Sequence, residues 1–110
     1  MYEYKAKLLK VIDGDTVDLM IDCGFCIFLK QRVRLTGINA PETRTKDLIE
    51  KEKGLASKEF LARRLSECNE IIVKTSLDKK GKYGRLLGEL FTNDISVNKE
   101  MINLGHAKRY

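Results

Sequence analysis

Hydrophobic and polar residues alternate along the first third of the chain with the period of two that is typical of half-buried β-strands. In residues 16–23, Val17, Leu19 and Ile21 fall on one face and Asp18 falls on the other. This alternation predicts a strand with one side turned toward a core.

Two further strands are predicted on either side of this one. Residues 4–12 end at the turn signal Asp13-Gly14, and residues 26–35 form the return strand of a hairpin. Arg34 lies between the last two inward positions of the return strand, so it is predicted to point to the opposite, wetter face. The inward positions of this strand are predicted to be Ile27, Leu29, Val33 and Leu35.

The rest of the chain alternates between helical and strand-like patterns. Residues 36–53 read as a long polar connection, which in a compact domain usually has a function or is mobile. The later elements are predicted to be a helix at 55–65, strands at 71–73 and 86–91 with a basic turn at 78–84 between them, and a helix at 97–104 that starts at Ser96 and stops at Gly105. Three strands, a helix, two strands and a helix predict a β-rich α+β fold, a five-stranded OB-fold barrel. A ferredoxin-like sheet would alternate its strands and helices differently.

Composition narrows the class of protein further. With 110 residues, of which 43% are hydrophobic, residues 1–110 are expected to form a single globular domain. No apolar run is long enough for a membrane span. No signal segment precedes the first strand, so either the chain stays inside a cell, as a cytoplasmic protein, or a leader has been removed, and the first is the expectation. The net charge of +5 favours a polyanion such as nucleic acid as the partner, although it also fits a charge that merely maintains solubility.

Three cysteines make a disulfide-stapled secreted scaffold improbable. Cys23 and Cys26 form a C-x-x-C pattern, but they fall at a predicted hairpin tip. A zinc site would need Cys68 and His106 from distant positions. Buried or incidental thiols are the better interpretation.

Three polar segments carry candidate chemistry for cutting a phosphodiester. The segments are Asp13-Gly14-Asp15-Thr16, the stretch from Arg34 through Asn39-Ala40-Pro41-Glu42-Thr43, and Lys82-Tyr83-Gly84-Arg85. Together they offer acidic oxygens for a hard metal ion and two guanidinium groups for a phosphate.

Each candidate residue has a functional and a structural interpretation. Asp15 is a candidate metal ligand, or only part of a turn. Arg34 and Arg85 can bind phosphate oxygens bidentately, or can be ordinary surface arginines. Glu42 can activate water as a general base, or be a solvated loop carboxylate. Tyr83 can contact a base or a phosphate, or pack beside a turn.

In combination and in order, these motifs resemble those of the staphylococcal nuclease, or thermonuclease-like, family. The matching segments are Ile12-Asp13-Gly14-Asp15-Thr16-Val17, Val33-Arg34-Leu35, Ala40-Pro41-Glu42-Thr43, Lys82-Tyr83-Gly84-Arg85 and Gly105-His106-Ala107-Lys108. They cover nearly the whole chain, so the resemblance is specific.

The resemblance implies a calcium-dependent hydrolase of DNA and RNA that leaves 3′-phosphorylated products. It assigns Asp15 to the first metal ligand and the carbonyl of Ala40 to another. It assigns Arg34 and Arg85 to phosphate binding and Glu42 to the general base. Lys82 and Tyr83 fall in the segment implied to contact the substrate.

Two departures from the family pattern change these expectations. Asn39 stands where the family has a second metal-binding aspartate, so weaker calcium binding or a preference for another divalent ion is a hypothesis. The chain stops at Tyr110, whereas well-known members continue into a further helix. The core is therefore expected to be sealed in another way, or to be only marginally stable.

Two other classes of function stay open on the sequence. A nucleic-acid-binding module that has lost cleavage would explain Asn39. A plain OB-type interaction domain would leave the spacing of Asp15, Arg34, Glu42 and Arg85 unexplained. The sequence does not indicate an oligomeric state.

Overall fold

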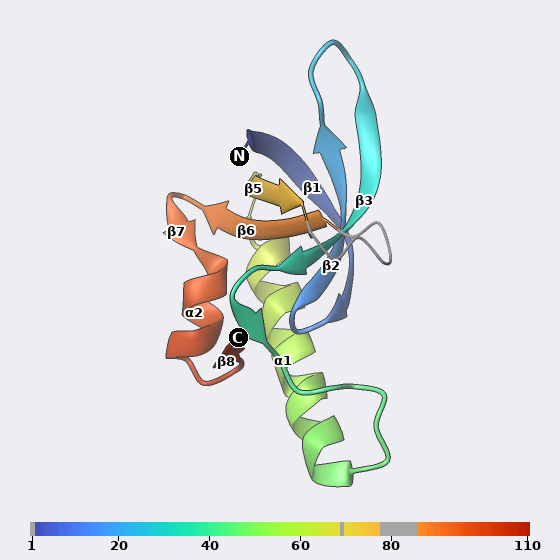
Figure 1. Ribbon diagram of the computed structural model, residues 1–110, viewed down its shortest axis with the longest axis vertical. Helices are drawn as coiled ribbons and strands as arrows, with labels where there is room; N and C mark the ends of the chain where they lie inside the picture. Colours follow the sequence, from blue (N-terminus) through green and yellow to red (C-terminus); the bar gives the residue numbers. More distant parts are fainter. Residues whose placement is uncertain (1, 69, 78–85) are drawn as a thin grey trace.

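The computed structural model describes residues 2–68, 70–77 and 86–110 (Figure 1). The predicted basic turn, with Lys82, Tyr83 and Arg85, lies outside these residues. Neither helix of the described chain has the length and apolar character needed to cross a bilayer.

A closed mixed β-barrel forms the body of the molecule, which confirms the predicted OB-like fold. Its strands are β1 (Tyr2–Asp13), β2 (Thr16–Asp22), β3 (Phe28–Leu35), β5 (Ile71–Leu77) and β6 (Leu86–Thr92). Four neighbouring pairs are antiparallel, in the order β3-β2-β1-β5-β6, and a parallel pairing of β3 with β6 closes the barrel. The pairing with β6 covers the edge of β3 at Val33, Arg34 and Leu35, where the barrel closes.

Three short strands supplement the barrel and were not predicted from the sequence. β4 (Ile38–Asn39) pairs with β8 (Lys108–Arg109), and β7 (Ile95–Ser96) extends the barrel sheet beside β6. Each has only two residues, too few for an alternating pattern to be recognised.

Helix α1 (Leu48–Ser66) lies against the barrel and extends below it in Figure 1. The predicted start at residue 55 was wrong, because Asp47 caps the helix by accepting hydrogen bonds from the backbone N–H groups of Ile49 and Glu50. The first turns project past the barrel and leave Leu48 and Ile49 exposed, so they lack a packing pattern. The connection before the helix is correspondingly shorter than predicted and spans residues 36–47.

Helix α2 (Val97–Asn103) confirms the second predicted helix and its Ser96 cap. Gly105 has a φ of +79°, which suits its predicted place after the helix end.

The hairpin of β2 and β3 extends beyond the barrel at the end opposite the start of α1 (Figure 1). Val33 and Leu35 are fully buried as predicted, but Ile27 and Leu29 are 53% and 49% exposed. Leu29 is exposed because alternation identifies a face of the strand, not how far the core beneath it reaches. Ile27 lies before the start of β3, in the turn of the hairpin, where its N–H donates to the carbonyl of Gly24.

The barrel closes where Gly88 of β6 pairs with Leu35 of β3. A Cβ atom on Gly88 would lie 2.7 Å from the Val33 side chain and 2.9 Å from that of Val73, so a larger residue does not fit. Asn98, which is 3% exposed, links the junction to α2. Its amide donates to the carbonyls of Thr36 (2.8 Å) and Gly88 (3.2 Å), and its carbonyl accepts from the N–H of Leu90 (3.1 Å).

We expect Asn98→Ala to lower the free energy of unfolding by about 1–3 kcal/mol, because it leaves buried backbone groups without partners. Urea unfolding measures the change. Asn103→Ala is the matched control on the exposed end of α2, with an expected effect within about 0.5 kcal/mol. Equal losses in the two variants would contradict a role for Asn98 in barrel closure.

Candidate active site

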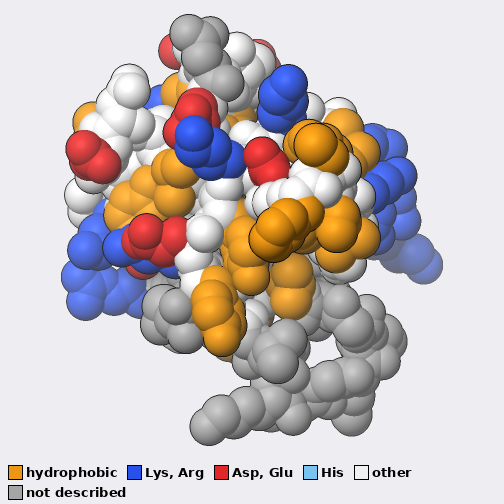
Figure 2. All heavy atoms as spheres, turned by 90° about the horizontal axis from the view of Figure 1, so that it is seen from above, with side chains coloured by type: hydrophobic (Ala, Val, Ile, Leu, Met, Phe, Trp, Pro, Cys, Tyr) orange, Lys and Arg blue, Asp and Glu red, His pale blue; other side chains and the backbone are white. Residues whose placement is uncertain are grey.

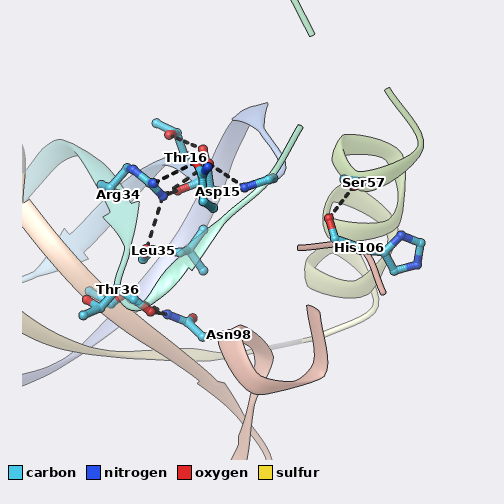
Figure 3. A network of polar contacts seen from close by, with 11 residues as sticks. Asp15, Thr16, Arg34, Leu35, Thr36, Ser57, Asn98 and His106 are labelled. Atoms are coloured by element: carbon cyan, nitrogen blue, oxygen red, sulfur yellow. Dashed lines mark hydrogen bonds and ion pairs between the residues drawn. The ribbon is translucent and has the colours of Figure 1, made fainter. Parts of the chain in front are cut away.

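The site is built around the carboxylate of Asp15, which lies in the two-residue turn between β1 and β2 (Figure 3). Asp15 is only 9% exposed. Its Oδ1 accepts a hydrogen bond from the Thr16 hydroxyl (3.0 Å), and its Oδ2 accepts one from the backbone N–H of Ala40 (2.9 Å). A buried carboxylate needs such partners, because burial without them carries a large desolvation penalty.

Arg34 faces Asp15 because Arg34 and Thr16 are paired residues of neighbouring strands. Arg34 Nη1 lies 3.3 Å from Asp15 Oδ2 and also donates to the carbonyls of Asp15 (3.4 Å) and Leu35 (3.3 Å). Arg34 Nη2 lies 3.5 Å from Asn39 Oδ1. The side chain is 17% exposed, so it sits in a more enclosed place than the predicted wetter face.

The guanidinium of Arg34 keeps one edge available. Among the described residues, no hydrogen bond engages its Nε–H, and Nη2 makes only the long contact to Asn39. Side-on binding of a phosphate by arginine uses two parallel N–H groups of this kind. The C-terminal residue, Tyr110, also lies against Arg34, with the guanidinium carbon 5.7 Å from the ring centroid.

The oxygens of Asp15 and Asn39 converge on the guanidinium of Arg34. Asn39 lies in β4, which β8 supports through the pairing of Asn39 with Lys108. This oxygen set suits a cation, as carboxylates and amide carbonyls are ligands of hard divalent ions. It is sparse in charge, and the described residues contain no cluster of three or more His, Cys, Asp or Glu side chains that could hold a metal.

Glu42 is exposed, and no hydrogen bond of the described residues involves its side chain. Ala40, two residues earlier, is held by Asp15 through its backbone N–H. Two residues of chain span at most about 7 Å, so the Cα of Glu42 lies within this distance of a fixed point. On its other side, the Thr43 hydroxyl donates to Asp13 Oδ1 at the end of β1. The loop is therefore tied to the barrel on both sides of Glu42.

Gly54 of α1 fixes the same loop from below. A Cβ atom on Gly54 would lie 2.4 Å from the backbone oxygen of Glu42 and 2.8 Å from that of Pro41. A Cβ atom on Gly14 would similarly meet Ala40 and Ser57, each at 2.8 Å. The two glycines allow the loop, the β1–β2 turn and the helix to approach closely.

The segment around His106 serves as a support. Ser57 of α1 donates to the His106 carbonyl (2.6 Å), as drawn in Figure 3, and the His106 ring stacks on Phe60 at 4.3 Å.

A hollow of about 320 Å³ lies beside the loop, between Asn39, Pro41, Glu50 and Lys53. Arg34 and Asp15 do not line it, although Asn39 and Ala40, which contact them, do.

The structure thus brings Asp15, Arg34, Asn39 and Ala40 together and places Glu42 on the adjoining loop. Arg85, Tyr83 and Lys82 lie outside the described residues. The sequence reasoning missed Thr16, Thr43 and Gly54. Nothing in the sequence indicated that Glu42 and Gly54 are in contact, because this contact depends on the path of the loop. The three cysteines are free: Cys26 is exposed, and Cys23 and Cys68 are partly buried, which agrees with the interpretation of buried or incidental thiols.

Comparisons with known proteins identify relatives of this chain. A family model described as staphylococcal nuclease homologue matches residues 32–110. Endonuclease YhcR of Bacillus subtilis is 32% identical over 114 residues, which cover 98% of this chain and 9% of that protein. An uncharacterised protein of Methanocaldococcus jannaschii is 32% identical over 130 residues, which cover 97% of this chain and 59% of that protein. Thermonuclease of Staphylococcus intermedius is 29% identical over 99 residues, which cover 90% of this chain and 55% of that protein. The chain therefore spans less than two thirds of the length of each of these relatives.

We expect Gly54→Ala to destabilise the protein by about 1–3 kcal/mol, because the added methyl overlaps the backbone of Glu42. The usual effect of this change inside a helix has the opposite sign, since alanine is favoured over glycine by up to about 1 kcal/mol. Thermal and urea unfolding give the sign directly. Lys53→Ala, at the neighbouring exposed position, is the control. A stabilised Gly54→Ala variant would show that the loop does not press on the helix.

Proposed function

Because this chain belongs to the family of staphylococcal nuclease homologues, we propose that it is a metal-dependent nuclease that hydrolyses phosphodiester bonds of DNA or RNA. The observation that supports this most directly is the convergence of Asp15, Arg34 and Asn39 beside a loop that is tied down on both sides of Glu42. Binding of nucleic acid alone would need positive charge, but not a carboxylate held in place next to a phosphate-binding arginine.

In the proposed reaction, Arg34 binds oxygens of the scissile phosphate through its open Nε–Nη2 edge. Fixed donors of this kind stabilise the charge that builds up on the phosphorane, and removing one typically costs about 10²–10³ in rate. The hydrogen bonds to the carbonyls of Asp15 and Leu35 hold the guanidinium in position before substrate binds. Arg85 is proposed as the second phosphate-binding arginine, with Lys82 and Tyr83 in the adjoining substrate-contacting segment.

Glu42 is proposed to orient water and to accept its proton as the general base. Such proton transfer contributes about 10²–10⁴ in rate. The exposed side chain is accessible to water, and its backbone oxygen lies so close to Gly54 that a side chain there would not fit.

The metal is proposed to be calcium, held by Asp15, by Asn39 and by the carbonyl of Ala40, with water completing the coordination. When bound, such an ion neutralises charge on the phosphate. The neutral Asn39 provides one charge less than an aspartate would, so another divalent ion is an alternative. The products are proposed to carry 3′-phosphates.

A second candidate function is a binding module with weakened or absent cleavage. It is favoured by the ion pair of Arg34 with Asp15, because this pair engages the only carboxylate of the proposed metal set. Metal binding then has to compete with Arg34 for the oxygens of Asp15.

Cleavage of denatured DNA in calcium, magnesium, manganese or chelator tests the nuclease proposal. We expect cleavage that requires metal, and a fall of about 10²–10⁴ in kcat for Glu42→Gln. Glu52→Gln, an equivalent change on the exposed side of α1, is expected to retain full activity. Product ends that polymerase extends only after phosphatase treatment would identify 3′-phosphates. Binding without cleavage in every ion would favour the binding module instead.

We expect Asn39→Asp to raise calcium affinity. A pair of charges 4 Å apart is worth about 4 kcal/mol at an effective dielectric near 20, and the adjacent Arg34 and water offset much of this. An increase of about tenfold, measured by titration calorimetry, is the expected net result. Asn103→Asp adds the same charge at the exposed end of α2 and controls for overall charge. Unchanged affinity in Asn39→Asp would remove residue 39 from the metal site.

A further inference from the structure

Strand β3 carries a row of basic side chains that starts at Arg34 and runs toward the hairpin tip. Alternate residues of a strand share a face, so Lys30 and Arg32 lie on the same face as Arg34, followed by Phe28. Lys30 and the side chain of Arg32 are exposed, and Phe28 is 57% exposed. We name this row, with Phe28 included, the basic track.

Two lysines of β1 widen the basic track. The register places Lys7 opposite Met20, and Met20 opposite Lys30, so these three side chains form one row across the sheet. Lys10 lies opposite Asp18 in the next row. Among the described residues, Lys7, Lys10 and Lys30 have no carboxylate within 4 Å.

One acidic side chain lies within the track and organises it. Asp18 is 6% exposed and accepts two hydrogen bonds from Arg32, at 2.9 Å from Nε and 3.3 Å from Nη2. These bonds, followed by the charges of Arg32, Lys30 and Lys10, lower the pKa of Asp18, whereas burial acts in the opposite direction. Asp18 stays ionised and holds Arg32 flat on the sheet, and the track keeps a net positive charge.

The far end of the track opens into a hollow of about 260 Å³. Phe28 and Met20 provide its apolar wall, and Lys7 lies at its edge. Lys5, Asp22 and Glu70 also line it, and Lys5 Nζ lies 4.0 Å from Glu70 Oε2, so acidic and basic side chains offset one another there. A base can stack on the Phe28 ring and donate its amino hydrogens to the carboxylate of Asp22. Figure 2 looks at the molecule from this end and shows hydrophobic side chains beside Lys and Arg groups.

We propose that the basic track is a binding site for single-stranded polynucleotide, which extends the substrate from the scissile phosphate at Arg34 to a base seated against Phe28. The site is continuous with Arg34. It rests on the proposed function only for the identification of the phosphate at Arg34 as the scissile one. The six steps along the strand from Arg34 to Phe28 span about 20 Å at roughly 3.3 Å each, enough for several nucleotides. OB-type domains bind about 4–16 nucleotides, so this reach is within their range.

The occupant is a single strand rather than a duplex because a base that stacks on Phe28 must be unpaired. Duplex phosphates could still bind the basic side chains, but the hollow would then stay empty. The track therefore predicts two separable effects, one from charge and one from stacking.

Lys30→Gln tests the charge and Lys99→Gln is its control. Lys99 is exposed on α2, which packs against β4, β6 and β8 rather than against β1–β3. Fluorescence anisotropy with a labelled 20-nucleotide single strand, in chelator, gives the affinity at several salt concentrations. We expect Lys30→Gln to bind several-fold more weakly and to lower the salt slope by about 0.7, the value for one contact to a single strand, while Lys99→Gln changes neither. Equal effects in the two variants would overturn the proposal.

Phe28→Leu tests the stacking, because it keeps an apolar side chain and removes the aromatic face. We expect about tenfold weaker binding of the single strand and unchanged binding of a 20-base-pair duplex. Equal losses for both ligands would overturn the proposed base-stacking site at Phe28. A change of oligomeric state, measured by light scattering, would also overturn it, because it would indicate that Phe28 contacts another copy of the chain.

Kinetics separate the track from the catalytic site. In metal, we expect Lys30→Gln and Phe28→Leu to raise KM for the 20-nucleotide strand with kcat unchanged, and to leave cleavage of a trinucleotide unaffected. Equal losses on both substrates would overturn the track. If the unmodified protein cleaves nothing in any ion, the nuclease proposal fails, whereas the binding measurements in chelator still decide the fate of the track.

Discussion

The buried carboxylate of Asp15 is the interaction on which the rest of the site depends. It receives the N–H of Ala40, the hydroxyl of Thr16 and the guanidinium of Arg34, and so joins the β1–β2 turn, strand β3 and the loop after β4. A charge in this position is stable only with all of these partners, because a buried ion without compensation is costly. The same contacts that satisfy Asp15 therefore fix where Arg34 points and where the loop leaves the barrel.

The rest of the site follows from close approach of backbones. Glu42 gains its position from its neighbours: Ala40 on Asp15, Thr43 on Asp13, and its own carbonyl against Gly54. The side chain itself stays exposed to water. A fixed backbone with an accessible carboxylate is the arrangement that a general base needs, since proton transfer requires both position and contact with water. Gly54 and Gly14 thus act on the site without offering any functional group.

The features predicted correctly from the sequence depend on local hydrophobic periodicity. The features that were missed depend on contacts between residues far apart in the chain. Alternation located the β2–β3 hairpin, and the five-strand barrel followed from the order of elements. The start of α1 was missed because Leu48 and Ile49 in its first turn are exposed, so no packing pattern marks it, and because Asp47 resembles any loop aspartate. The burial of Ile27 and Leu29 was predicted wrongly because the β2–β3 hairpin extends beyond the hydrophobic core. The ion pair of Arg34 with Asp15 could not be predicted, since it requires the strand register that sets Arg34 opposite Thr16.

The pairing of Arg34 with Asp15 also gives Asn39 a physical meaning. One carboxylate and one guanidinium cancel, and the neutral Asn39 leaves the centre of the site without the net negative charge that would attract a cation strongly. The same neutrality removes a group that would repel phosphate. Positive charge lies beside the site on Lys7, Lys10 and Lys30, and in the proposed binding mode a polynucleotide meets this charge before it reaches Arg34. Arg32 adds no net charge, because it is paired with Asp18. In this chain, affinity for the strand is therefore expected to come more from the sheet surface than from a bound ion, which is the reverse of a site built on two carboxylates.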